Sequence, residues 1–345
     1  MTTSTNLENC NENDFYDTSE VIYTVSAIFY SFIVIVGVPE NVAALCFLIC
    51  KKKELTEAKI YMISLTVADL LFVTFLPLWI DYYYRKGNWI FTSFMCSLWG
   101  SLFYINTYNT IFFLAVISFI RYRAVSQPVT AAQSRQIVRG SVLTALIWTL
   151  TVCFSLPIVI NHEDYLIKTN TGNERCFESY EAKNTKTQVI VIHMLMELGF
   201  VLSLVVVIAN NVLLLRILSA DQKALRTSQN KFKVRASRLV FMVLVIYTVS
   251  FLPYHVVHLL WTLLVLNFWK SDDCAFRKTV NDVHHISLCL MCTNCILDPI
   301  LYCFMTTNFR QYFKELRLSF TRKCILGGSP KPQEIQLSRN VTRVR

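Results

Sequence analysis

Several polar side chains interrupt stretches of this sequence that are otherwise apolar. They fall near the middle of such stretches, and they are Asn41, Asp69, Asn106, Thr110, Asn294 and Asp298. An ionised side chain costs roughly 2.5–3.5 kcal/mol at the centre of a membrane helix, so residues of this kind are candidates for function. Two carboxylates with amide and hydroxyl oxygens form a donor set for a hard cation such as sodium. The same residues could instead only hold helices together around water, and both interpretations stay open.

A second group combines histidines with aromatic residues. Five of the six histidines lie near the ends of three apolar stretches, and they are His193, His255, His258, His284 and His285. Tyr254, His258 and Trp261 are spaced i, i+4 and i+7, on one helical face. Other stretches add Trp79, Tyr82, Tyr83, Tyr104 and Tyr108. Aromatic faces attract a quaternary ammonium group by ~0.5–2 kcal/mol per contact, and histidine N–H groups donate to phosphate. A single buried histidine is usually a packing residue, but this group favours a pocket for a zwitterionic phospholipid headgroup.

Two prolines and one arginine are the residues that bear on conformational change. Pro253 and Pro299 lie inside apolar stretches, where proline removes a backbone hydrogen bond and bends a helix. Arg121 stands at the end of another stretch. Each alone is ordinary, because prolines bend many membrane helices and an arginine at a helix end commonly reaches towards water. Two bends facing a polar core favour a protein that changes conformation.

The stretches that carry these residues predict seven transmembrane helices. They span residues 21–49, 60–83, 94–125, 137–160, 189–218, 239–266 and 280–303. Each reaches the ~20 residues that a bilayer core of ~30 Å requires. Backbone groups in lipid must be paired and the alternation of a β-barrel is missing, so the predicted fold class is an all-α seven-transmembrane helix bundle. We expect residues 1–20 outside, 21–305 as the membrane domain and 306–345 as a cytoplasmic tail.

Composition and charge agree with this organisation. Hydrophobic residues make up 54% of the chain and charged residues 16%, which argues against a soluble domain. Of the 33 lysines and arginines, 24 fall on the side that holds the C-terminus, which predicts an outer N-terminus and a cytoplasmic tail. The net charge of +10 is therefore mostly a topology signal, and no nucleic-acid partner is expected. No phosphate loop, zinc spacing or nucleophile motif appears, so we expect no enzyme.

The cysteines fit an oxidising outer side. Four of the twelve fall there, and they are Cys10, Cys96, Cys176 and Cys274. An even number in an oxidising compartment predicts disulfides, but four cysteines allow three connectivities and the residues alone leave them open.

The order of these features resembles the rhodopsin-like receptor family across the spanning region. The matching positions are Asn41, residues 65–69, Cys96 lying 25 residues before Arg121, Trp148, Pro253 and residues 298–302. The resemblance implies that a ligand bound outside lets the sixth helix swing outward, which opens a crevice near Arg121, Tyr122 and Tyr302 for a heterotrimeric G protein. It also implies a Cys96–Cys176 disulfide, an allosteric sodium ion as the one candidate cofactor, and arrestin and receptor kinases as further partners.

Single positions narrow the ligand class. Opsins need a lysine where this chain has Cys292, and amine receptors need an aspartate where it has Phe103. Residues 76–80, 87–90, 103–108, 253–257, 261–263 and 281–299 resemble those receptors of the family that bind a phospholipid mediator. That resemblance matches His193, His255 and Trp261 to pocket residues, whereas Tyr254, His258, His285 and Ser287 depart from the pattern. The expected ligand site is Trp79, Tyr83, Phe103, Tyr104, Tyr108, His193, Tyr254, His255, His258, Trp261, His285 and Ser287.

Two departures keep alternatives open. Ile120 occupies a position that is usually acidic in the family and cannot pair with Arg121, so we expect raised basal signalling, and a decoy receptor with weak coupling is one alternative. A Cys10–Cys274 pair would resemble nucleotide and chemokine receptors, which remain alternatives together with an orphan receptor. A transporter or channel is disfavoured because the sequence lacks inverted repeat halves.

The tail predicts contact with the inner leaflet. Apolar residues recur there at helical spacing, namely Phe309, Tyr312, Phe313, Leu316 and Phe320. This spacing predicts a short amphipathic eighth helix lying on membrane lipids. Cys324 follows it and is a palmitoylation candidate or a simple free thiol. Together these features predict a multi-pass receptor of the plasma membrane.

Overall fold

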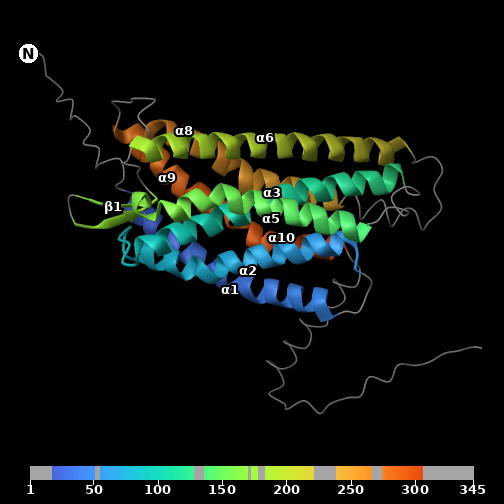
Figure 1. Ribbon diagram of the computed structural model, residues 1–345, viewed down its shortest axis with the longest axis horizontal. Helices are drawn as coiled ribbons and strands as arrows, with labels where there is room; N and C mark the ends of the chain where they lie inside the picture. The colour runs from blue at the N-terminus through green and yellow to red at the C-terminus, as the bar shows by residue number, and fades with distance from the viewer. Residues whose placement is uncertain are drawn as a thin grey trace, which may run out of the picture.

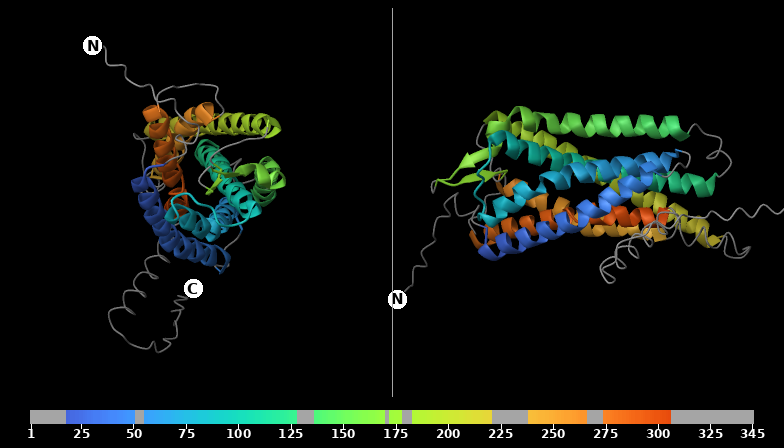
Figure 2. Two further views of the ribbon diagram at one scale, coloured as in Figure 1. Left: turned by 90° about the vertical axis from the view of Figure 1, so that its left-hand side faces the viewer. Right: turned by 90° about the horizontal axis from the view of Figure 1, so that it is seen from below.

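The computed structural model describes residues 18–50, 55–127, 136–169, 172–177, 183–220, 238–265 and 274–305. Long helices lie side by side along the molecule (Figure 1) and surround a common axis when seen end-on (Figure 2). They are α1 (Glu20–Cys50), α2 (Glu57–Tyr84), α3 (Ser93–Ser126), α5 (Gln136–Ile160), α6 (Lys183–Ala220), α8 (Leu252–Val265), α9 (Cys274–Met291) and α10 (Asn294–Met305). Residues 238–246 are also helical and lead through η4 (Tyr247–Phe251), a π-helical turn, into α8.

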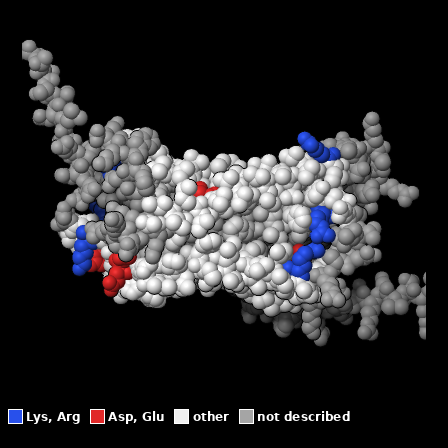
Figure 3. All heavy atoms as spheres, turned by 45° about the horizontal axis from the view of Figure 1, so that its top comes forward, with Lys and Arg blue, Asp and Glu red and all other residues white. Residues whose placement is uncertain are grey.

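Within the described residues, seven helical spans are long and apolar enough to cross a membrane. They are Glu20–Cys50, Glu57–Tyr84, Ser93–Ser126, Gln136–Ile160, Ile190–Ile217, Arg238–Leu264 and Ala275–Leu301. Large apolar side chains cover the outside of this bundle, among them Ile35 at 72% and Phe241 at 65% exposure. Figure 3 shows charged side chains mainly at the two ends and an uncharged belt between them. Such a surface is stable in lipid, so the predicted seven-helix membrane fold is confirmed.

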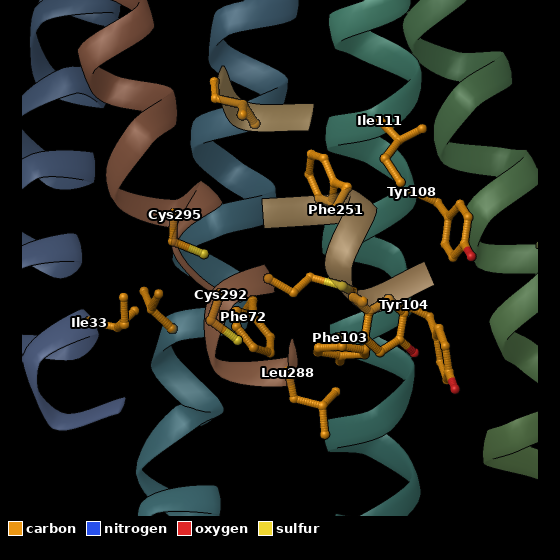
Figure 4. Packing of buried hydrophobic residues seen from close by; sticks show 14 of the residues in the cluster. Ile33, Phe72, Phe103, Tyr104, Tyr108, Ile111, Phe251, Leu288, Cys292 and Cys295 are labelled. Carbon is orange, nitrogen blue, oxygen red and sulfur yellow. The ribbon is translucent and has the colours of Figure 1, made fainter. Parts of the chain in front are cut away.

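The interior is built around α3, most of whose spanning part is buried, whereas only about a quarter of the spanning parts of α5 and α6 is buried. Figure 4 shows Phe72 of α2, Phe103 of α3 and Leu288 of α9 converging in this interior. The rings of Phe72 and Phe103 lie 6.0 Å apart. Aromatic rings at this separation pack favourably edge to face or tilted, which fixes α2 against α3.

The seventh span bends earlier than its proline suggested. The sequence predicted one helix over residues 280–303 bent by Pro299, but α9 ends at Met291 and α10 begins at Asn294. The Thr293 hydroxyl donates to the Leu290 carbonyl at 2.6 Å and lies 2.7 Å from the Ser250 hydroxyl. Side chains thus satisfy backbone groups that the break leaves unpaired. Pro299 has an effect of its own, because it cannot bond to the Cys295 carbonyl, which accepts instead from Asn41 Nδ2 at 2.7 Å.

One end of the bundle carries a small hairpin that the all-α prediction did not include. The turn η2 (His162–Tyr165) leads into β1 (Leu166–Lys168), which pairs antiparallel with β2 (Glu174–Cys176). Cys176 forms a disulfide with Cys96 in the first turn of α3. The predicted Cys96–Cys176 bond is therefore confirmed. Cys10 and Cys324 lie outside the described residues, as does the expected eighth helix.

Candidate functional site

A cavity of about 500 Å³ lies at the hairpin end of the bundle. Its lining comes from α2, α3, the hairpin, α8 and α9, and consists of Trp79, Trp99, Gly100, Phe103, Tyr104, Cys176, Phe177, Tyr254, His258, Trp261, His284, His285 and Leu288. Ligand pockets in proteins commonly combine apolar walls with a few polar groups, as this cavity does. We refer to this cavity as the outer pocket.

One wall of the outer pocket is a continuous aromatic stack. Trp79 of α2 lies on Trp99 of α3 with ring centres 3.7 Å apart and planes within 9°. Trp99 stacks in turn on Phe103, one helical turn further along α3, at 5.6 Å. Phe103 meets Tyr254 of α8 edge to face at 5.8 Å. The faces of such aromatic rings attract a ligand cation.

Histidines and a tryptophan form the opposite wall. His258 Nδ1 of α8 lies 3.0 Å from His284 Nε2 of α9, and the His284 ring stacks on Trp261 at 4.4 Å. Trp261 Nε1 donates to Asn281 Oδ1 at 3.0 Å, which holds the indole in place. Next to His284, His285 Nδ1 lies 2.6 Å from the Tyr83 hydroxyl. Within the described residues, Nε2 of His258 and Nε2 of His285 have no hydrogen-bond partner, so both can serve a ligand.

The α6 side holds polar residues behind this wall. The Tyr104 hydroxyl lies 3.2 Å from His193 Nε2. His255 stacks on Phe200 at 3.8 Å, and its Nδ1 lies 3.0 Å from Glu197 Oε1. Glu197 is an acidic residue inside an apolar span, a signal that was present in the sequence but not used for the predicted site.

The hairpin closes the outer pocket through the disulfide. Cys176 brings Phe177 over Gly100 of α3, where a side chain would overlap the Phe177 ring. Phe177 has φ 62° and stacks on Tyr165 at 4.7 Å. Burial in this contact raises the pKa of Tyr165 to about 12, so its phenol is neutral at pH 7.

The structure brings together most, but not all, of the predicted ligand residues. Trp79, Phe103, Tyr104, Tyr254, His258, Trp261 and His285 line the outer pocket. Five others lie behind it, and they are Tyr83, Tyr108, His193, His255 and Ser287. Tyr83 orients His285, while the Ser287 hydroxyl donates to the His284 carbonyl at 2.7 Å. Tyr108 and His193 line two neighbouring cavities.

Six lining residues were absent from the predicted site, namely Trp99, Gly100, Cys176, Phe177, His284 and Leu288. Trp99 precedes Phe103 by one helical turn, so its spacing was a usable signal. His284 was already part of the histidine group. Phe177 had no signal of its own, because its position follows from the disulfide and the backbone turn beside it.

The predicted polar core also assembles. Asn106 Nδ2 donates to Asp69 Oδ1 at 2.8 Å, and Asn294 Nδ2 donates to Asn106 Oδ1 at 3.1 Å. The Thr110 hydroxyl donates to Asp298 Oδ2 at 3.4 Å. All five side chains are buried. In the described part of the chain, Asp69 Oδ2, Asp298 Oδ1 and Asn41 Oδ1 have no hydrogen-bond partner, so oxygen atoms suited to a hard cation remain free in the core.

Two of the three predicted switch residues lie at the other end of α3. They are Arg121 and Tyr122, which are half-buried in its last turns. Tyr302 belongs to α10, but its side chain lies outside the described part. Between the two ends, the Tyr247 hydroxyl of η4 donates to the Ile111 carbonyl of α3 at 2.7 Å. The sixth span is thereby tied to α3 where the π-helical turn begins.

A seven-helix bundle with a pocket at one end, a buried polar core and an arginine at the opposite end of α3 defines a membrane receptor of the G-protein-coupled class. The chain belongs to the family described as 7 transmembrane receptor (rhodopsin family), which it matches over residues 40–302. It is accordingly a multi-pass protein of the plasma membrane and a receptor rather than an enzyme.

Comparison with known receptors shows which members of this family the chain is similar to. The platelet-activating factor receptor of Capra hircus is 39% identical over 94% of this chain and 95% of its own length. The platelet-activating factor receptor of Homo sapiens is 38% identical over 89% and 90%. G-protein coupled receptor 68 of Mus musculus is 31% identical over 85% and 77%. These relatives confirm the resemblance to receptors for a phospholipid mediator, and the receptor that the chain resembles is the platelet-activating factor receptor.

Proposed function

We propose that the chain binds a zwitterionic phospholipid mediator, platelet-activating factor or a related lipid, in the outer pocket and then activates a heterotrimeric G protein. The observation that carries this proposal is that two chemically different walls face one cavity. The stack of Trp79, Trp99 and Phe103 suits a quaternary ammonium group, and His258 and His285 offer free ring nitrogens to a phosphate. The names of the most similar relatives support the same ligand class.

The histidine tautomers fit this role. When the Tyr83 hydroxyl donates to His285 Nδ1, the His285 proton resides on Nε2, which can then donate to a phosphate oxygen. The proposed contact residues are those that line the pocket, whereas Tyr83, Tyr108, His193, His255 and Ser287 act by positioning them.

Stimulated nucleotide exchange tests the proposal directly. The full chain in nanodiscs is mixed with purified G protein, and platelet-activating factor, lysophospholipids and nucleotides are compared as stimuli. We expect platelet-activating factor to stimulate exchange and His258→Ala to raise the half-maximal concentration at least tenfold. His162→Ala is the matched control, because this histidine contacts Ser93 outside the pocket. If only nucleotides stimulated exchange, the ligand would be a nucleotide and not a phospholipid. If the lipid bound without stimulating exchange, the chain would be a decoy receptor.

We further propose that the polar core binds an allosteric sodium ion. Asp69 and Asp298 supply carboxylate oxygens without protein partners, and Asn106, Thr110 and Asn294 surround them. Agonist affinity measured in sodium chloride and in N-methylglucamine chloride tests this. We expect lower affinity in sodium and no such difference in Asp69→Asn. If the unmodified chain had equal agonist affinity in the two salts, the polar core would not bind sodium and would only pack the helices together.

The remaining proposals concern topology and the tail. We propose that the N-terminus is extracellular, that the tail meets arrestin and receptor kinases, and that its amphipathic segment lies on membrane lipids next to a palmitoylated Cys324. The bias of lysine and arginine towards the C-terminal side supports this orientation. An antibody against an N-terminal epitope tests the orientation, and we expect it to stain intact cells. Staining only after permeabilisation would mean that the N-terminus is cytoplasmic.

A further inference from the structure

A second cavity lies between α6 and α8, behind the histidine wall of the outer pocket. Its volume is about 380 Å³ with its open side included, and it is lined by Ile190, His193, Met194, Glu197, His258, Leu259, Thr262 and Leu263. Met194, Leu259 and Leu263 are 60%, 45% and 37% exposed, so this rim faces the bilayer. Among the described residues, the two cavities have only His258 in common. We refer to the second cavity as the lipid-side crevice.

Glu197 gives the lipid-side crevice an acidic group inside the membrane. It lies seven residues after Ile190, where the apolar span begins, which is about 10 Å along the helix at 1.5 Å per residue. Its side chain keeps 17% of its surface exposed. Figure 3 shows a small acidic area in the otherwise uncharged belt. An acidic group at this depth is costly in lipid unless a partner compensates it.

Within the described residues, the protein supplies only part of that compensation. Glu197 Oε1 lies 3.0 Å from His255 Nδ1, and no described residue bonds to the second carboxylate oxygen. The sequence of α8 contains no lysine or arginine, and those of α6 are Lys183, Lys186 and Arg216, far from Glu197 along the helix. A purely structural link between α6 and α8 would require only the contact with His255. The exposed carboxylate surface therefore points to an external cation.

One further polar group of the lipid-side crevice has no hydrogen-bond partner within the described residues. It is Thr262 Oγ1, and Thr262 is only 8% exposed. A buried hydroxyl without a partner is destabilising, so a ligand with a hydrogen-bonding group would be stabilised there. The crevice thus combines a carboxylate, a hydroxyl and an apolar rim open to lipid.

We propose that the lipid-side crevice binds the ammonium group of a single-chain amphiphile that enters from the bilayer. The ammonium contacts the Glu197 carboxylate and donates to the Thr262 hydroxyl, and the hydrocarbon chain packs on Met194, Leu259 and Leu263. This site is separate from the outer pocket and takes a cation without requiring a phosphate. Charge complementarity and the apolar rim together select a long-chain amine over a neutral or anionic lipid.

Photolabelling tests the proposal. The full chain in phosphatidylcholine nanodiscs is exposed to hexadecylamine that carries a diazirine on its chain and a terminal alkyne, and labelled peptides are mapped. We expect labelling within residues 190–197 and 259–263. Glu197→Gln should lower this labelling at least fivefold, and Glu197→Asp should retain most of it. Hexadecanol with the same photoreactive group should label weakly and equally in both variants.

A second glutamate provides the matched control. Glu40 lies in α1, is half-buried and has one carboxylate oxygen without a partner, so Glu40→Gln removes a comparable membrane charge elsewhere and should leave the labelling unchanged. Thermal unfolding of each variant verifies that it is folded. Equal labelling by amine and alcohol, or undiminished labelling of folded Glu197→Gln, would overturn the proposal. Because no response to platelet-activating factor enters the measurement, its result is independent of the function proposed for the outer pocket.

Discussion

Histidines around the outer pocket are each held by a polar contact from another helix. His285 meets Tyr83, His258 meets His284, and His193 meets Tyr104. Such a contact fixes the ring and determines which nitrogen carries the proton. For His285 the orienting residue is Tyr83, which does not line the outer pocket, so the free ring nitrogen of His285 is set by a residue behind the pocket wall.

Tyr83→Phe should weaken phospholipid binding without unfolding the receptor. The change removes the hydroxyl 2.6 Å from His285 Nδ1, so the ring can rotate and its tautomer is no longer fixed. A hydrogen bond of this kind contributes about 0.5–1.5 kcal/mol, which corresponds to a loss of about twofold to tenfold in affinity. Competition binding measures it. Tyr84→Phe is the control, because Tyr84 is 81% exposed, and equal affinities for the two variants would contradict the assigned role.

Sequence spacing predicted pocket residues well where they lie on one helix. It predicted poorly those that a separate chain segment places in the pocket. Tyr254, His258 and Trp261 follow helical periodicity and do line the outer pocket. Phe177 reaches it only because a disulfide and a positive φ place it there. Glu197 was overlooked since its partner, His255, lies on a different helix and no sequence pattern joins them.

At the scale of helices, a buried ion pair joins α2 to α5. Glu57, in the first turn of α2, accepts from Arg139 Nε at 2.9 Å and from Arg139 Nη2. The Tyr61 hydroxyl donates to the same carboxylate at 2.8 Å. The side chain of Glu57 is 5% exposed and that of Arg139 is 30% exposed. Two donors from Arg139 fix both the distance and the rotation between the two helices.

Arg139→Ala should lower the thermal midpoint of the receptor in detergent. Removing the guanidinium leaves a buried carboxylate with one remaining donor, at a cost of about 1–3 kcal/mol after allowance for the exposure of Arg139. That cost corresponds to a decrease of about 2–6 °C. Lys86→Ala breaks the exposed pair with Glu20 and should leave the midpoint unchanged. Equal midpoints for Arg139→Ala and the unmodified receptor would mean that the pair is not stabilising.

Gly100 tests how closely the hairpin must approach α3. A Cβ at this position would overlap the Phe177 ring, so Gly100→Ala should displace Phe177 and lower ligand affinity by about fivefold or more. Gly199→Ala is the matched change, because its Cβ would lie at an ordinary 3.4 Å from Phe112. Binding isotherms measure the ligand affinity of the two variants. The prediction is wrong if Gly100→Ala binds the ligand as tightly as Gly199→Ala.

Helix positions were more predictable than helix ends and breaks. Apolar length located all seven spans, but α6 begins at Lys183 and α9 at Cys274, each six residues before its predicted start. These first turns contain polar residues that continue the helix beyond the apolar stretch, and hydropathy does not report them. The break before Asn294 likewise depends on Ser250, a residue of another span that contacts Thr293 at 2.7 Å.

At the scale of the whole molecule, the outer pocket and the end of the bundle that holds Arg121 share α3 and the sixth span. Phe103 and Tyr254 meet in the outer pocket, and Tyr247 bonds to the Ile111 carbonyl closer to Arg121. A ligand that moves Tyr254 therefore acts on a span whose π-helical turn begins at Tyr247. Two conformations that differ at this turn would connect the pocket to a G protein, provided that the ligand binds one of them more tightly.

We expect Ile120 to hold the resting conformation less firmly than an acidic residue would. It packs half-buried against the core, and its apolar side chain cannot itself form a charge pair with Arg121. Ile120→Asp should supply one worth about 1 kcal/mol, which shifts a two-state equilibrium about fivefold and lowers basal nucleotide exchange accordingly. Ile120→Asn changes polarity without adding charge and should lower it much less. Ligand-free exchange on purified G protein measures all three forms, and equal basal rates in Ile120→Asp and the unmodified chain would show that resting stability comes from elsewhere in the bundle.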